Sequence, residues 1–270
     1  RRPPLPALGT AQVAAITTND LKTLGTAAMA GLSAEQVGSL TTVQVAALSN
    51  AQVAGLSAAQ FAGLGTDDLA AMSSTQIAVL GTAQAAALSG QHLAASETAD
   101  IAALSTAALR ALGADQVAAF TSGQFAALSS AQAVALTADQ IAGLGTANLN
   151  ALGTSQFAAL SSAQVAAISA AQAAKLENAD VAALSTAAVK GLSQEAIAAL
   201  TTGQVVALTS AQVGALSSGQ MSAMTNADLA KLESADIKAL STTTLAGLSA
   251  AQMGGLTTDH VVSRSVRDSA

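Results

Sequence analysis

Apolar side chains return at every eighth position of this chain. Every residue whose number is a multiple of eight, from Leu8 to Leu256, is a repeat anchor, and 26 of these 32 anchors are Leu. The other six anchors are Ile16, Met72, Ser96, Phe120, Ile168 and Met224. No insertion or deletion interrupts the spacing, which indicates that every residue of the eight-residue unit is constrained by geometry. We call this unit an octad and number its positions from 0, the anchor, to 7.

Each octad carries a signal for the start of a helix. Position 1 is Ser or Thr in 22 of 32 octads, position 4 is Gln in 18 and Asp in 6, and position 5 is a large apolar residue in 29. Positions 6 and 7 are mostly Ala or Gly, as in octad 48–55, LSNAQVAG. Ser or Thr followed three residues later by Gln is a capping box, in which the hydroxyl accepts from the N–H of position 4 and Gln reaches back to the N–H of position 1. The pattern therefore predicts one short helix per octad.

Charged residues indicate the same helix direction. All 15 acidic residues within the octads fall at positions 1, 3 or 4, and all six basic residues fall at positions 6 or 7. Acids at the start and bases at the end are favoured by the dipole of a helix that runs from position 1 to position 7.

Two other architectures fit the pattern less well. In one continuous helix the apolar stripe would rotate by about 80° per octad and could not be buried on one side. A β-solenoid lacks support because the apolar positions do not alternate with period two, and Ala and Gln are poor strand formers. We therefore predict an all-α solenoid, or superhelix, of very short capped helices that hold one another, since isolated helices of this length do not form in water. The predicted organisation is a proline-rich leader over residues 1–7, an uninterrupted array over 8–263 and a polar tail over 264–270.

A longer period accompanies the octad. The octads that begin at Ile16, Ser96 and Leu176 share Asp at position 4 and are each followed by an octad with Ala at that position, which gives an 80-residue spacing typical of segmental duplication. Odd and even octads show no consistent difference. The sequence thus leaves open how many octads make one turn of the superhelix.

Composition limits the function classes. Hydrophobic residues make up 51% of the chain, with four Phe and no Trp or Tyr, so the core is expected to be thin. The net charge of −6, without basic clusters, argues against a nucleic-acid partner. The chain has no Cys, which excludes disulfides and thiolate metal sites, and no apolar run long enough for a membrane span. Arg1 and Arg2 are followed by prolines rather than by an apolar signal-peptide core, and we expect the chain to be a piece of a longer one.

Few residues are candidates for chemistry. His92 and His260 both lie at position 4, and we expect each to replace Gln at a helix start rather than to bind metal. The pairs Asp67–Asp68 and Asp259–His260 have no calcium-loop spacing and are expected at solvated helix starts. No position 1 hydroxyl belongs to a His and carboxylate constellation. We accordingly predict no catalytic, cofactor-binding or metal-binding residues, no cofactor and no enzymatic activity.

The rows of polar side chains allow more than one interpretation. Stacked octads would align the position 4 amides, either as helix caps, which we favour, or as a ladder that binds a polar ligand. Regular Ser and Thr rows are also compatible with binding of carbohydrate or ice. The nearest candidates for an apolar binding patch are Phe120, Phe125 and Phe157, but positions 0 and 5 predict them to be buried.

The octads resemble two known kinds of repeat. The segment 200–208, LTTGQVVAL, resembles the first helix of transcription-activator-like effector repeats over about one octad, without their second helix or base-reading pair. Nearly the whole chain is similar to the octapeptide-repeat stretches of very large bacterial exported, adhesin-like proteins. That resemblance implies a structural spacer or stalk, or a low-specificity interaction module, outside or on the surface of a bacterium. The alternative is a solenoid that binds a specific polysaccharide, protein or ice surface through its Gln or Ser/Thr rows.

Overall fold

The computed structural model describes residues 7–260, and this part of the chain is all-helical. It contains 31 helices of four to six residues, one for each octad from 8–15 to 248–255, and no strand; residues 258–260 of the next octad are helical as well. The predicted all-α solenoid of very short helices is thereby confirmed. No helix in residues 7–260 is both long and apolar enough to cross a bilayer.

The chain divides into two compact units, and the boundary lies between residues 135 and 136. The helices of the first unit are α1 (Thr10–Ala14), α2 (Thr18–Lys22), α3 (Thr26–Ala30), α4 (Ala34–Gly38), α5 (Thr42–Ala47), α6 (Asn50–Ala54), α7 (Ala58–Ala62), α8 (Thr66–Ala70), α9 (Ser74–Ala78), α10 (Thr82–Ala86), α11 (Gly90–Ala95), α12 (Thr98–Ala103), α13 (Thr106–Ala111), α14 (Ala114–Ala118), α15 (Ser122–Ala126) and α16 (Ser130–Ala135). The helices of the second unit are α17 (Ala138–Ala142), α18 (Thr146–Asn150), α19 (Thr154–Ala159), α20 (Ser162–Ala166), α21 (Ala170–Ala173), α22 (Asn178–Ala183), α23 (Thr186–Val189), α24 (Gln194–Ala198), α25 (Thr202–Ala207), α26 (Ser210–Ala215), α27 (Ser218–Ala223), α28 (Asn226–Leu229), α29 (Ser234–Ala239), α30 (Thr242–Ala246) and α31 (Ala250–Gly254).

Every helix begins at position 2 because position 1 is its N-cap. Ser49, the N-cap of α6, has extended backbone (φ −73°, ψ 155°), and its hydroxyl accepts a hydrogen bond from the backbone N–H of Gln52. The helix ends before the next anchor, whose N–H closes a tighter turn onto the carbonyl of position 5, as from Leu56 to Val53 at 3.2 Å. Anchors such as Leu48 return to extended backbone (φ −61°, ψ 141°), which allows the next N-cap to follow directly.

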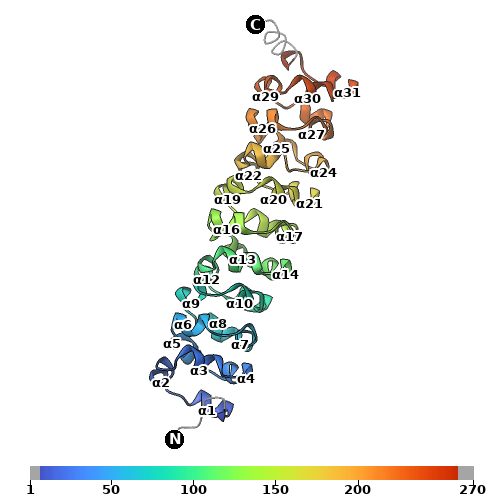
Figure 1. Cartoon of the computed structure of the whole chain (residues 1–270). Helices are drawn as coiled ribbons and strands as arrows, with labels where there is room; N and C mark the ends of the chain where they lie inside the picture. Colours follow the sequence, from blue (N-terminus) through green and yellow to red (C-terminus); the bar gives the residue numbers. More distant parts are fainter. Residues whose placement is uncertain (1–6, 261–270) are drawn as a thin grey trace. The chain divides into compact units, whose positions relative to one another are not determined.

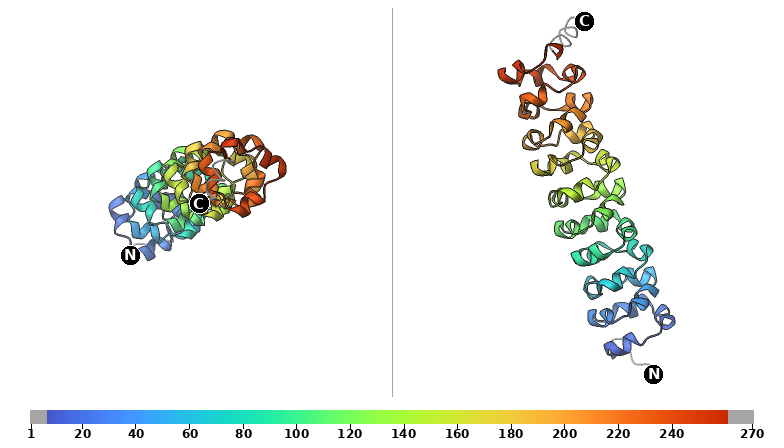
Figure 2. Two further views of the ribbon diagram at one scale, coloured as in Figure 1. Left: turned by 90° about the horizontal axis from the view of Figure 1, so that it is seen from above. Right: turned by 180° about the vertical axis from the view of Figure 1, so that it is seen from behind.

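Within each unit a helix packs against the third helix after it, so three octads form one coil of the solenoid. In the first unit α1 lies against α4, α4 against α7 and α7 against α10, and in the second α20 lies against α23 and α23 against α26. Figure 1 shows the resulting layers in each unit, and the right-hand view of Figure 2 shows the same layers from behind. Because a coil contains three octads, each odd-numbered octad packs on an even-numbered one. Odd and even octads therefore share the same sides of the solenoid, which explains why their sequences do not differ.

The core of each unit is a narrow column of anchors and position 5 side chains. Leu56 and Val53 are buried in the first unit, as are Leu152 and Phe157 in the second. Small residues at positions 6 and 7 allow the coils to approach closely. A Cβ built at Gly191, position 7 of its octad, would lie only 2.1 Å from the carbonyl oxygen of Ser162 in the coil before.

Parts of the predicted organisation fall outside the described residues. They are residues 1–6 of the predicted leader, residues 261–263 of the predicted array and the predicted tail over 264–270.

Candidate functional site

The row of polar side chains at position 4 is the most regular chemical feature of the solenoid. Each Gln amide oxygen completes the predicted capping box on its own helix. In α4, the N–H of Ser33 donates to Gln36 Oε1 at 2.7 Å, and the N–H of Gln36 donates to Ser33 Oγ at 3.1 Å. Where Gly replaces Ser or Thr, only the first of these bonds exists, as from Gly81 N–H to Gln84 Oε1 at 2.9 Å.

The amide nitrogen of the same side chain binds the preceding coil. Gln84 Nε2 donates to the carbonyl oxygens of Val53 and Leu56, both at 2.8 Å. These acceptors lie 31 and 28 residues earlier, at the end of α6 and at the next anchor, where the carbonyls are beyond the regular hydrogen bonds of the helix and can accept from a side chain. The same pair of bonds recurs along both units, for example from Gln52, Gln60, Gln76, Gln124, Gln172, Gln204 and Gln212.

Burial shows what this row does. From Gln36 onward, most of the position 4 Gln side chains are only 1–7% exposed, and their amides bond to backbone of two different coils. A buried amide with both ends satisfied stabilises the fold and is not available to a ligand from solvent. The structural role is thus observed, and it includes the contact between coils in addition to the predicted cap.

Both histidines replace Gln at position 4. His260 is buried; its Nδ1 accepts from the N–H of Thr257 at 3.2 Å, and its Nε2 lies 2.9 Å from the carbonyl oxygen of Leu232, 28 residues earlier. The ring therefore reproduces both bonds of a Gln amide if Nε2 carries the proton. His92 Nδ1 accepts from the N–H of Ser89 at 3.2 Å, and burial lowers the pKa of His92. The prediction that these residues are helix-start substitutes is confirmed.

Aspartate at position 4 forms hydrogen bonds that differ from those of Gln. Its carboxylate cannot donate to the carbonyls of the preceding coil, and in three of the six octads with Asp it accepts instead from a hydroxyl 26 residues earlier. The three bonds of this kind are Ser74 to Asp100 at 3.0 Å, Thr202 to Asp228 at 2.9 Å and Ser210 to Asp236 at 2.7 Å. Burial raises the pKa of Asp100, partly opposed by the bond from Ser74.

Among the described residues, Asp180 has a strongly raised pKa. Burial, together with the nearby negative charge of Glu177, raises the pKa of Asp180 to about 6. Raised pKa values accompany active sites but also structural groups. No group of three or more His, Cys, Asp or Glu in residues 7–260 is arranged to hold a metal ion.

The remaining sequence candidates are acidic residues at helix starts and three phenylalanines. The expectation of solvated helix starts holds for Asp67 and Asp259, which are exposed at position 3, but is wrong for Asp68 and His260. Both are buried at position 4, because this position faces the preceding coil, and Asp68 accepts from the N–H of Gly65 at 3.0 Å. Phe120, Phe125 and Phe157 are buried as predicted, and the first two rings are in contact, with centroids 5.6 Å apart.

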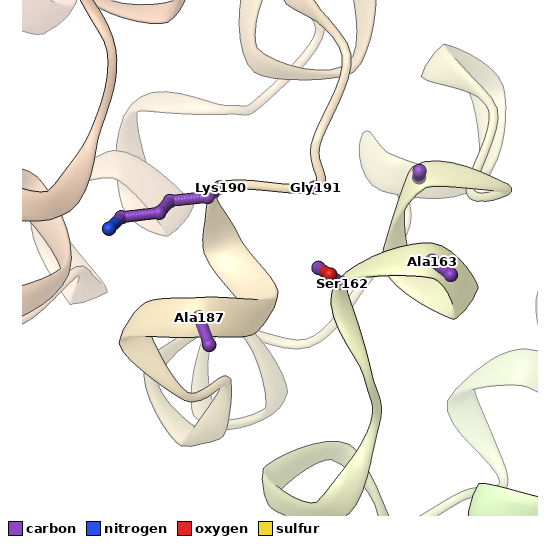
Figure 3. Close-up of a pocket in the computed structure, with 6 residues that line it drawn as sticks. Ser162, Ala163, Ala187, Lys190 and Gly191 are labelled. Carbon is purple, nitrogen blue, oxygen red and sulfur yellow. The ribbon is translucent and has the colours of Figure 1, made fainter.

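A surface pocket lies between α20 and α23 (Figure 3). Its lining consists of Ser162, Ala163, Ala166, Ala187, Lys190 and Gly191. All but Gly191 are exposed, and the Lys190 side chain points away from Ser162. One hydroxyl and one divergent ammonium group do not form a convergent polar site.

The sequence contained a signal for the bonds between coils that the predictions missed. Glu fills the last position of a capping box as well as Gln does, yet no octad has Glu at position 4. The choice of Gln over Glu indicates that the amide nitrogen, which a carboxylate lacks, contributes a second interaction wherever Gln occurs.

Comparison with known families identifies the repeat. The family model described as ALTTAQ repeat matches residues 13–50, 61–95, 93–130, 141–170, 173–210 and 229–263. The matches beginning at residues 13, 93 and 173 are 80 residues apart, in agreement with the spacing of the predicted duplication. A comparison with curated proteins found no match.

Proposed function

The chain belongs to the ALTTAQ repeat family, and from that premise we propose that its repeats form a structural spacer or low-specificity interaction module without catalytic activity. The proposal includes a place outside or on the surface of a bacterial cell, as part of a larger protein. That location rests on the similarity of the octads to repeats of exported, adhesin-like proteins.

The observation that carries the proposal is the double use of the position 4 amide. One side chain caps its own helix and ties it to the coil before, as Gln212 does with Thr209, Val181 and Leu184. Because these bonds join only adjacent coils, each additional coil extends the solenoid in the same way, as in other repeat proteins. The position 4 amides, which are the most regular polar groups, are therefore used to cap helices and to join coils.

The proposal can be tested by removing one coil at a time. Deletion of residues 57–80 or of residues 185–208 takes out three octads from the first or the second unit. If the chain is a spacer, both variants should remain helical. Solution scattering should show that each deletion shortens the affected unit by the thickness of one coil, which is the spacing of packed helices, about 8–10 Å.

The same two deletion variants separate a spacer from a specific binder. A spacer gives equal, weak responses for the full chain and both variants on glycan and protein arrays. Saturable binding of one glycan or protein, lost in one deletion and retained in the other, would show a specific site and refute the spacer interpretation.

A further inference from the structure

Three coils of the solenoid have no Gln at position 4. Each consists of three consecutive octads, and the coils begin at Leu88, Leu176 and Met224. Their position 4 residues are His92, Asp100 and Ala108 in the first of these coils, Asp180, Ala188 and Ala196 in the second, and Asp228, Asp236 and Thr244 in the third. The amide bonds that tie other octads to the coil before are therefore absent from all three.

The coil of residues 176–199 differs from the other two. The hydroxyl bonds that Asp100, Asp228 and Asp236 accept join the other two coils to the residues before them. In residues 176–199 the side chains form only local bonds, such as that of Ser185 with the N–H of Ala188. Within residues 7–199, no side-chain hydrogen bond joins this coil to an earlier octad.

Position 4 of this coil is nevertheless buried, as Gln is elsewhere. Ala188 and Ala196 are 0% exposed, and Asp180 is 3% exposed. The 28-residue spacing pairs the three positions with anchor carbonyls that accept no side-chain hydrogen bond among the described residues, those of Leu152, Leu160 and Ile168. The acceptors of the usual bonds are thus in place, and the donors are missing.

The next contact along the chain has all of these bonds. Gln204, Gln212 and Gln220 each donate to a position 5 carbonyl and to an anchor carbonyl, at 2.7–3.1 Å. We call this contact, of residues 200–223 with the coil before, the bridged joint. The contact of residues 176–199 with the coil before is the unbridged joint. Both joints lie in the second unit.

Few polar contacts tie the chain where it crosses the unbridged joint. Among the described residues of the second unit, one side-chain hydrogen bond passes over the peptide bond between Lys175 and Leu176, from Gln204 to the carbonyl of Ala173. The side chain of Glu177, the N-cap of α22, makes no cap bond. The surface pocket between α20 and α23 lies at this joint (Figure 3). The joint is held by the packing of α22 on α19, α23 on α20 and α24 on α21.

Hydrogen bonds distinguish the two joints, because apolar packing is common to both. Val165 at the unbridged joint and Val189 at the bridged joint occupy the same octad position, and both are 0% exposed. Each hydrogen bond adds modestly to stability, but the six bonds of the bridged joint together favour its closed state by on the order of a hundred-fold or more. The unbridged joint lacks this contribution.

We propose that the unbridged joint is a hinge, at which the second unit opens while the bridged joint stays closed. Each coil of a repeat protein contacts only its neighbours, so opening at one joint leaves the coils on both sides folded. A chain that is pulled or bent yields between Lys175 and Leu176 before it yields at the bridged joint. This conformational property goes beyond the spacer function and does not depend on any partner.

Thiol labelling of two single-cysteine variants of the 270-residue chain tests the hinge, because the chain has no Cys of its own. Val165→Cys places a thiol at the unbridged joint, and Val189→Cys places one at the bridged joint. The carbonyl of Val189 accepts from Gln220 at 3.1 Å, whereas that of Val165 has no side-chain donor. Under native conditions the Val165→Cys thiol should react at least about ten-fold faster. Equal rates, or faster labelling at position 189, would overturn the proposal.

Adding the missing donors should close the hinge. Ala188→Gln and Ala196→Gln together supply two amides to the unbridged joint, in octads whose Ser185 and Ser193 already cap their helices. In this background the Val165→Cys thiol should react at least about ten-fold more slowly. Circular dichroism confirms that the variant keeps its helix content.

Removing donors should open the bridged joint. Gln212→Ala and Gln220→Ala together reproduce there the alanines of the unbridged joint, and should speed labelling of the Val189→Cys thiol at least about ten-fold. This change needs no new space in the core, so it is decisive even where added Gln side chains do not fit. Gln252→Ala, which removes an amide from another contact of the same unit, is the matched control and should leave the rate unchanged. A rate that does not respond to the double substitution, or that rises equally in the control, would contradict the hinge.

Discussion

Glutamine and glutamate are both suited to a capping box, yet position 4 holds 18 Gln and no Glu. The structure explains the difference through one atom. Gln204 Nε2 donates to the carbonyls of Ala173 and Leu176, at 2.8 and 2.7 Å, in a site where Gln204 is buried. A carboxylate there would remove the side-chain donor from both carbonyls, of which that of Ala173 keeps only the backbone N–H of Leu176, and would place negative charge beside them. The cap was predictable from local spacing, whereas the second bond requires knowing which octads are neighbours in space.

The same substitution at a buried and at an exposed position 4 tests the bonds between coils. Gln212→Glu should lower the free energy of unfolding at pH 7 by about 3 kcal/mol or more, because a buried carboxylate faces two carbonyls. Gln12→Glu, in the first coil, keeps the acceptor that the N–H of Gly9 uses at 2.8 Å and should change stability by less than about 1 kcal/mol. Chemical denaturation measures both, and equal losses would show that the bonds between coils do not matter.

The raised pKa of Asp180 leads us to expect that the stability of the fold depends on pH. Its pKa is about 6 in the fold, above the ordinary value of 3.8, so the folded state binds the proton more tightly than the unfolded state does. The stabilisation from protonation is complete below about pH 4 and is lost as pH rises through about 6. Asp180→Asn should remove this contribution, and Glu177→Gln should reduce it by removing the neighbouring charge. Urea titrations between pH 4 and 7 measure the change, and unaltered pH profiles in both variants would contradict the assignment.

At the scale of the helix, each element is too short to be stable alone, and packing against neighbouring helices supplies the stability that it lacks. The start of each helix was predictable, because Ser or Thr at position 1 and Gln at position 4 act within one octad. The partner of each helix was not, because all octads share one pattern and none marks its neighbour. The packing of α23 on α20 depends instead on close backbone approach at single small residues such as Gly191, beside the carbonyl of Ser162.

Gly191 allows a test of this close approach. Gly191→Ala would place a Cβ 2.1 Å from the Ser162 carbonyl oxygen and should destabilise the second unit by about 1–3 kcal/mol as the coils separate. Gly255 occupies the same octad position, but a Cβ there would lie 3.4 Å from the carbonyl oxygen of Gln252, an ordinary contact distance. Gly255→Ala should therefore be neutral or stabilising by up to about 1 kcal/mol. Thermal melts of the pair check the order, and a reversed order would exclude close backbone approach as the cause.

At the scale of the whole molecule, the unit of folding is smaller than the unit of the superhelix. A coil needs three octads, but any three consecutive octads can form one, since the contact between coils uses the same positions throughout. The eight-residue pattern was sufficient to predict a solenoid over the described residues. It could not predict three octads per coil, because that number follows from the angle between successive helices rather than from which positions are apolar.

Deletions of different length should reveal this unit. Removal of residues 201–208, one whole octad, joins Leu200 to the cap at Thr209 and should keep the helix content and change the melting temperature by only a few degrees. Removal of residues 201–204 takes out a cap and the Gln204 donor and leaves half an octad, so it should cost more than about 3 kcal/mol. Circular dichroism melts measure both, and similar behaviour of the two variants would refute the octad as the unit.

The 80-residue period has a consequence for how such a protein can evolve. Eighty residues are ten octads, or three coils and one further octad. In a regular solenoid with three octads per coil, a segment repeated after 80 residues therefore begins on the next of the three sides of the coil. A surface feature carried by the segment would therefore appear on a different side in every copy. Selection for a single binding side would favour duplications of whole coils, whereas a step of 80 residues preserves the octad but not the coil. A gene of this kind can recombine at any octad boundary and still encode a protein that folds.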